Sequence, residues 1–157
     1  MTIKRLPRRA LTKGFSLVEV LVALLVLAVG LLGMLLLQTR GSQLNQSAYL
    51  QSQAMFLAED IVERMRANVA MVENYDIDFG SEAAVGADAC DDASSPCTAA
   101  EMVEADIAQW LADLTDMLPA GDGAVSVGDP SGNLYPVTVQ VSYQQGETYT
   151  FQLEAML

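Results

Sequence analysis

The feature that most constrains this sequence is an apolar run at residues 15–37, in which Glu19 is the only charged side chain. As an α-helix that rises about 1.5 Å per residue, the run spans roughly 34 Å, slightly more than the ~30 Å hydrocarbon core of a bilayer. A stretch of this length and composition predicts a membrane-spanning helix.

Charge is divided unevenly between the two sides of this run. The segment that ends at Gly14 holds five bases and no acid, whereas the rest of the chain holds three arginines and all 20 Asp and Glu residues. A short basic segment stays in the cytoplasm while the acidic remainder is exported. We therefore expect a single-pass protein whose larger part is periplasmic or extracellular.

A cleaved secretory signal is the alternative interpretation of such an N-terminus. The apolar region of a signal peptide usually runs about 7 to 15 residues and ends at a cleavage site with small residues. Here the apolar run is longer and continues into the polar string QTRGSQ, which is a poor cleavage site. The pattern favours a retained anchor.

The composition excludes several kinds of chemistry. The chain has no histidine, which rules out Ser-His-Asp catalysis and histidine-ligated zinc. Its only lysines, Lys4 and Lys13, precede the apolar run, and its excess of acid repels nucleic acid. We predict no enzyme activity, cofactor, metal or nucleic-acid partner. The weakest alternative is a membrane-anchored periplasmic enzyme with paired carboxylates, because the acids cluster in a loop without a recognisable partner.

The string KGFSLVEVLVALLVLAVGLLG, residues 13–33, resembles the class III leader and transmembrane segment of type IV pilins and type II secretion pseudopilins. The resemblance implies that residues 1–14 are a leader removed by a prepilin peptidase, which cuts between Gly14 and Phe15 and N-methylates Phe15. It also assigns Glu19 to pairing with the N-terminal amine of a neighbouring subunit during assembly. A lone carboxylate in a membrane helix costs roughly 2.5 to 3.5 kcal/mol, and a nearby ammonium compensates it.

Residues 38–72 are predicted to be the amphipathic second half of one long helix that begins in the membrane. Asp60 and Arg64 are spaced as i,i+4 and Glu63 and Arg66 as i,i+3, which is typical of solvated ion pairs on a helix surface. The apolar stripe expected to face a core, at spacings of three and four, consists of Leu44, Ala48, Met55, Ala58, Val62, Met65, Val69 and Val72.

Three further strings are similar to the minor pilins of the PilV (type IV pilus modification protein) family: GLLGMLLLQ at residues 30–38, NQSAYLQSQAMFLAEDIVERMRAN at residues 45–68, and DIAQWLADLTDMLPAGDGAVSV at residues 106–127. The resemblance implies a minor pilin that helps to initiate pilus assembly, enters the filament or its tip, and supports twitching motility and adhesion. The implied partners are the prepilin peptidase, other minor pilins, the major pilin, the inner-membrane assembly platform and a tip adhesin. The implied location is the bacterial inner membrane, with a cytoplasmic N-terminus and a periplasmic head, and then the pilus. A minor pseudopilin of type II secretion is the alternative.

Residues 74–98 are predicted to be a long loop that contains both cysteines. In an exported chain Cys90 and Cys97 are expected to form a disulfide, because neither a C-x-x-C spacing nor a histidine supports metal or redox use. Oxygen-rich loops can also hold calcium, but the spacing lacks an EF-hand pattern, so a solvated acidic loop is preferred. The acids concerned are Asp76, Asp78, Glu82, Asp88, Asp91 and Asp92.

Residues 73–157 are predicted to form a periplasmic pilin head of α+β class. The spacing of Thr98 and Glu101 predicts a capping box at the start of a short second helix. Trp110 is expected to anchor this helix in the core, and the helix is expected to end at Pro119. After it, AVSVG, residues 134–143 and TYTFQLEAM alternate between apolar and polar residues, which predicts a small antiparallel sheet. The expected apolar helix face consists of Val103, Ile107, Trp110, Leu111, Leu114, Met117 and Leu118.

Overall fold

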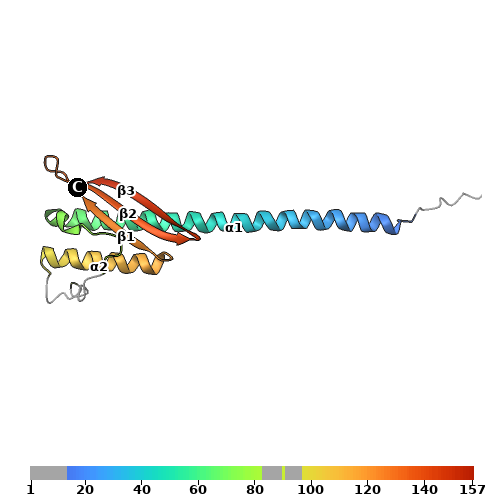
Figure 1. Cartoon of the computed structure of the whole chain (residues 1–157), viewed down its shortest axis with the longest axis horizontal. Coiled ribbons are helices and arrows are strands. Elements are labelled where there is room, and N and C mark those ends of the chain that lie inside the picture. Colours follow the sequence, from blue (N-terminus) through green and yellow to red (C-terminus); the bar gives the residue numbers. More distant parts are fainter. Residues whose placement is uncertain (1–13, 83–89, 91–96) are drawn as a thin grey trace, which may run out of the picture. The chain divides into compact units, whose positions relative to one another are not determined.

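The computed structural model describes residues 14–82, Cys90 and residues 97–157 (Figure 1). The leader predicted at residues 1–14 therefore lies outside the described residues except for Gly14. The chain divides into two units, residues 1–43 and 44–157, and each is described by itself.

In the first unit the described chain is almost entirely helical. Helix α1 begins at Leu17 and runs to Ala67 in the second unit. An 18-residue window near its N-terminus has a mean hydropathy of 3.1, and none of that window is buried. By length and composition this helix can cross a membrane, and the apolar side chains of that window have no partner among the residues that the structure describes.

In the second unit α1 presents one buried face to a core. Its buried side chains recur at intervals of three and four residues, as expected for one face of an α-helix: Leu50, Ala54, Leu57, Ala58, Ile61, Val62 and Met65.

The predicted stripe on this helix is partly wrong. Ala58, Val62 and Met65 are buried as expected, but Leu44 is 71% exposed and Met55 is 36% exposed. Ala48 and Val69, also in the predicted stripe, are exposed as well. The buried face begins only at Leu50, and Met55 follows the buried Ala54, so its side chain points about 100° away around the helix axis.

The first α-helix also ends earlier than predicted. It stops at Ala67, and a 3₁₀ helix, η1 (Val69–Tyr75), takes the chain onward. Val72 and Tyr75 of η1 are buried.

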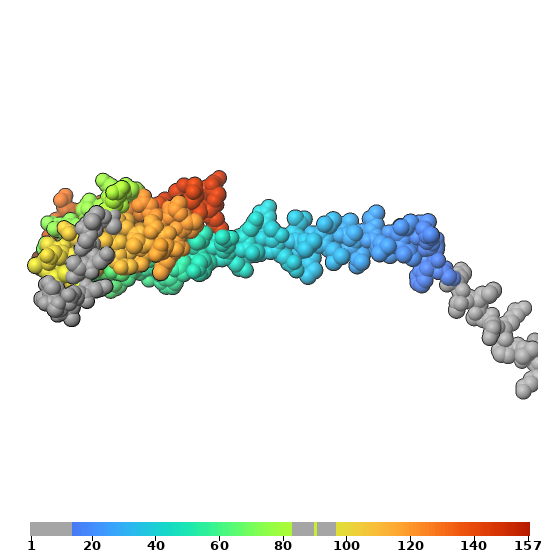
Figure 2. Space-filling model, turned by 90° about the horizontal axis from the view of Figure 1, so that it is seen from below, coloured from blue at the N-terminus to red at the C-terminus, as the bar shows by residue number. Residues whose placement is uncertain are grey.

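Helix α2 (Ala99–Met117) begins with the predicted capping box. The backbone N–H of Glu101 donates to Oγ1 of Thr98 at 3.3 Å, and the N–H of Thr98 donates to Oε2 of Glu101 at 2.8 Å. The predicted apolar face is largely confirmed, although Met117 is 52% exposed. Figure 2 shows α2, coloured yellow to orange, at the surface of the head.

Trp110 is the core anchor that the sequence predicted. It is fully buried, and its indole N–H donates to the backbone carbonyl of Leu57 on α1 at 2.8 Å. Its ring packs on Gly123, where a Cβ would collide with the indole and with Leu114. Only glycine therefore allows the sheet to approach α2 this closely.

The three strands form one antiparallel sheet in the order β1-β2-β3. They are β1 (Asp122–Val127), β2 (Pro136–Gln145) and β3 (Glu147–Met156), which confirms the predicted strands. Gly146, with φ of 78°, makes the tight turn between β2 and β3. Buried side chains from α1, η1, α2 and the sheet form a single core. The head is α+β, with two helices and a small sheet, as predicted.

Candidate functional site

The N-terminal candidate residues lie at the start of α1. Gly14 and Phe15 precede the helix, and Phe15 is 83% exposed. The Ser16 carbonyl accepts the first helical hydrogen bonds, from the N–H of Glu19 at 3.0 Å and of Val20 at 3.2 Å. Glu19 therefore lies in the first turn, where the helix dipole favours a negative charge.

The surroundings of Glu19 are otherwise apolar. A groove of about 570 Å³ along this part of the helix is lined by Phe15, Glu19, Val20, Ala23, Leu24 and Leu27. Within residues 14–82, Cys90 and residues 97–157, no cation forms an ion pair with Glu19, since all four ion pairs found there involve Arg64 or Arg66. Chemically, the Glu19 carboxylate is a single anionic group that can form an ion pair with an ammonium group.

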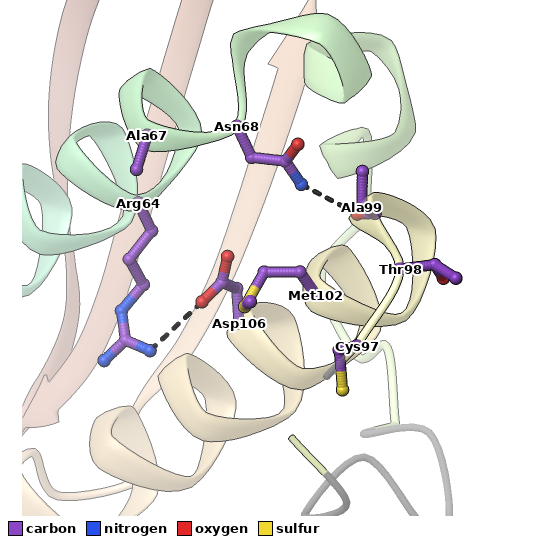
Figure 3. Close-up of a pocket in the computed structure, with 8 residues that line it drawn as sticks. All are labelled: Arg64, Ala67, Asn68, Cys97, Thr98, Ala99, Met102 and Asp106. Carbon is purple, nitrogen blue, oxygen red and sulfur yellow. Dashed lines mark hydrogen bonds and ion pairs between the residues drawn. The ribbon is translucent and has the colours of Figure 1, made fainter. Parts of the chain in front are cut away.

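A second polar site joins the two helices of the head. We call it the clasp, and it consists of Asp60, Arg64, Tyr75 and Asp106. Arg64 donates from Nε to Asp60 at 2.8 Å on its own helix. It also donates from Nη1 to Asp106 on α2 at 3.5 Å (Figure 3). The side chains of Arg64 and Asp106 are only 28% and 13% exposed.

Tyr75 completes the clasp from η1. Its hydroxyl donates to Oδ2 of Asp106 at 2.6 Å, although the residue as a whole is fully buried. Burial, together with the hydrogen bond to the Asp106 carboxylate, raises the pKa of Tyr75 well above its ordinary value. Burial alone would lower the pKa of Arg64, but Asp60 and Asp106 outweigh it and the pKa is raised. Both groups therefore keep their protons in the folded head at neutral pH.

The clasp borders a pocket of about 420 Å³ between the end of α1 and the start of α2. Asn68, just past α1, donates from Nδ2 to the carbonyl of Ala99 at 2.8 Å across this pocket (Figure 3). Cys97 also lines it and forms a disulfide with Cys90. No free thiol or unpaired base is found among the described pocket residues, and the side chains present act as structural links between helices.

The sequence predicts only part of this site. It predicted the helix-surface pairs, and both are present, with Arg66 and Glu63 joined at 2.5 Å. It did not find that Arg64 also reaches α2, because Asp106 is 42 residues away. A single sequence does not show which residues pair over such a distance. The one available signal is that Asp106 directly precedes Ile107, which belongs to the predicted apolar face of the second helix.

The acidic loop has a structural use in its described part. The carboxylate of Asp76 accepts a hydrogen bond from the N–H of Val127 at 2.9 Å. The carbonyl of Asp78 accepts one from the Ser81 hydroxyl at 2.6 Å. Asp88, Asp91 and Asp92 lie outside the described residues. Within the part of the chain that the structure describes, no group of three or more candidate metal ligands comes together.

Comparison with known protein families gives two matches. Residues 9–35 match the prokaryotic N-terminal methylation motif. Residues 36–108 match the Tt1218-like family, described as type IV pilin Tt1218. These matches show a type IV pilin. No curated protein and no solved structure matches the chain.

The matched stretches bear on both sites of this pilin. The methylation motif includes Gly14, Phe15 and Glu19, and it implies processing by a prepilin peptidase and assembly with other pilins. The pilin match covers all four residues of the clasp. Pilins are structural proteins, and an apolar N-terminal helix suits membrane anchoring and incorporation into a pilus.

Proposed function

We propose that this pilin is a minor pilin of the PilV type that helps to initiate assembly of a type IV pilus. It is made with the leader at residues 1–14, the membrane segment at residues 15–37, the amphipathic helix at residues 38–72 and the head at residues 73–157. The peptidase cuts between Gly14 and Phe15 and methylates Phe15. The subunit then enters the filament or its tip and supports twitching motility and adhesion.

The observation that carries this proposal is the isolated carboxylate of Glu19 at the start of an exposed apolar helix. In lipid, that charge is costly unless a cation approaches it, and the new amine on Phe15 of a neighbouring subunit is such a cation. Pairing within a low-dielectric environment compensates both charges. Subunits of this design therefore gain by lying side by side in the membrane.

The assignment as a minor pilin is supported by the segments that resemble the PilV family. The strings at residues 45–68 and 106–127 supply Leu57 and Trp110, which are linked by a hydrogen bond across the two helices. The resemblance thus falls on residues that pack together in the head. The orientation follows from the basic leader, which keeps the N-terminus in the cytoplasm and the head in the periplasm.

The partners proposed are the prepilin peptidase, the other minor pilins, the major pilin, the inner-membrane assembly platform and a tip adhesin. The force for assembly comes from a separate ATPase. None of these contacts involves nucleic acid, because the mature chain has a large excess of acid.

The experiment that tests the proposal replaces Glu19 by alanine in cells that make the pilus. Leader removal, followed by the electrophoretic shift of the protein, is expected to continue, whereas the number of surface pili falls strongly. Glu59→Ala, which removes an exposed carboxylate from the head part of α1, is the matched control and is expected to leave piliation unchanged.

Normal piliation in the Glu19→Ala strain would contradict the assembly role of Glu19. A loss of protein secretion with intact pili would instead identify a pseudopilin of type II secretion.

A further inference from the structure

The two edges of the sheet use their backbone donors differently. On β1 every outward N–H group has an acceptor within the head. Val125 and Ile77 exchange two backbone hydrogen bonds of 2.9 Å, and the N–H of Val127 donates to the Asp76 carboxylate at 2.9 Å. The N–H of Gly123 donates to the carboxylate of the residue before it at 2.8 Å. The β1 edge is therefore closed.

The β3 edge is open. Tyr135 and Leu157, at the end of the β2-β3 ladder, exchange two backbone hydrogen bonds of 2.7 and 3.0 Å. Hydrogen-bonded and non-hydrogen-bonded pairs alternate along an antiparallel ladder, so the N–H groups of every second residue of β3 point away from β2. Among the described residues none of these groups has an acceptor. They belong to Thr148, Thr150, Gln152, Glu154 and Met156.

The core-facing side of β3 is only partly covered. Val139 and Val141 of β2 are fully buried. Their cross-strand partners Leu153 and Phe151 lie on the same face but are only half-buried. Tyr149, also on this face, is 45% exposed. On this face the side chains of β3 are therefore more exposed than those of β2, and the rest of the head does not fully cover the apolar face of the sheet.

Strand β3 also lacks the usual protection of an edge. Monomeric proteins blunt open edges with proline, lysine or a β-bulge. β3 has no proline and no base, and its register with β2 is continuous from Glu147 to Met156, without a bulge. Its only charges are the carboxylates of Glu147 and Glu154. A long open strand with exposed apolar side chains is the surface to which another strand adds.

The negative charge of the head indicates the charge of the segment that can bind at β3. All acidic residues except Glu19 lie in residues 44–157, where Arg64 and Arg66 are the only bases. Both arginines are already paired with carboxylates of the head. A second copy would bring the same excess of negative charge and be repelled, whereas a basic segment is attracted.

We propose that β3 is the docking edge for an extended, basic segment of a different pilin-type subunit, which adds to the sheet as a fourth strand. Its apolar side chains cover Phe151 and Leu153, and its lysine or arginine side chains lie near Glu147 and Glu154. This inference rests on the proposed function, because it takes the partner from the pilus assembly.

Proline at one edge position tests the backbone contact. Thr150→Pro removes an outward N–H without breaking a bond to β2, and Thr150→Ala is the matched control with the N–H retained. A photo-crosslinking residue replaces Gln152 in the full-length chain, in cells that make all pilin subunits. Mass spectrometry identifies the adduct. We expect an adduct with a different pilin subunit in the alanine variant and about tenfold less in the proline variant.

A charge variant provides a second test that does not depend on proline. Glu147→Lys combined with Glu154→Lys is expected to reduce the adduct several-fold, whereas Asp116→Lys, on exposed α2 surface, leaves it unchanged. The fluorescence of Trp110 shows that each variant is folded.

Equal adduct yields in the proline and alanine variants, or an adduct only with a second copy, would overturn the inference. Its failure is distinct from failure of the proposed function, which is decided by pilus counts in the Glu19→Ala strain. A strain that depends on Glu19 for piliation yet gives no adduct at Gln152 contradicts the docking edge alone.

Discussion

Replacing Asp106 by alanine removes the centre of the clasp, and the structure allows its cost to be worked out. Asp106 accepts from the Tyr75 hydroxyl at 2.6 Å and from Arg64 at 3.5 Å. The variant leaves the hydroxyl of Tyr75 in a fully buried residue without its charged acceptor. Arg64 loses less, because it keeps Asp60 at 2.8 Å and is 28% exposed.

The two losses differ in size. A hydrogen bond to a charged group contributes about 1.5 to 3 kcal/mol when its loss leaves a buried donor unpaired. A partly exposed ion pair contributes less than about 1 kcal/mol. We therefore expect Asp106→Ala to lower the free energy of unfolding by about 2 to 3 kcal/mol. Asp113, whose Oδ2 lies 3.9 Å from Arg64 and which is 26% exposed, is the control, with less than about 0.5 kcal/mol.

The assay is urea unfolding of the processed chain in mild detergent. Trp110 is the only tryptophan and is fully buried, so its fluorescence reports the head. Tyr75→Phe, alone and combined with Asp106→Ala, separates the two contacts, and we expect a coupling of about 1 kcal/mol between them. If Asp106→Ala costs no more than Asp113→Ala, the clasp does not hold the helices together.

Two further predictions use the same assay. The pKa of Tyr75 is raised in the folded head from its ordinary value of 10.0, so as pH rises the tyrosine ionises first in the unfolded chain. The contribution of Tyr75 to the free energy of unfolding is therefore expected to be complete below about pH 10 and to fall as pH rises above it. Tyr75→Phe should reduce this alkaline loss, and an identical pH profile in both proteins would contradict the assignment. Gly123→Ala places a methyl group against Trp110 and Leu114 and is expected to cost about 1 to 3 kcal/mol. Ser126→Ala, on the exposed surface of β1, is the control and is expected to change the free energy of unfolding little. Gly132→Ala, at an exposed turn, is unsuitable as a control because Gly132 has a φ of 72°, where an alanine adds strain.

Local patterns made most of the fold predictable. The capping box depends on residues three apart, Thr98 and Glu101, and the strands depend on simple alternation, so both could be found from neighbouring residues. The register of the buried face on α1 was harder, because apolar residues such as Leu44 and Met55 also occur at helical spacings outside that face. Burial along α1 depends on where the rest of the head begins to cover the helix. The sequence of α1 alone does not contain that information.

The candidate sites divide in the same way. The segment from Gly14 to Glu19 is contiguous, so its pattern could be recognised from the sequence alone, although its chemistry remains a prediction. The clasp joins Arg64 to Asp106 across 42 residues, and only the antiparallel packing of the two helices brings these side chains together. The closure of the β1 edge by Asp76 is likewise invisible before folding, since the sequence shows this aspartate only as one of several acids in a loop.

The unequal edges of the sheet also limit how far strands can associate. Growth of a continuous β-fibril requires two open edges on every subunit, so that each addition creates the site for the next. In the described residues of this head, β1 is closed and β3 alone is open. Even when salt screens the repulsion between acidic heads, pairing of two copies through β3 uses the open edge of both and ends at a dimer. The sheet therefore offers a single edge for strand addition, which limits association of the free subunit through this sheet to pairs.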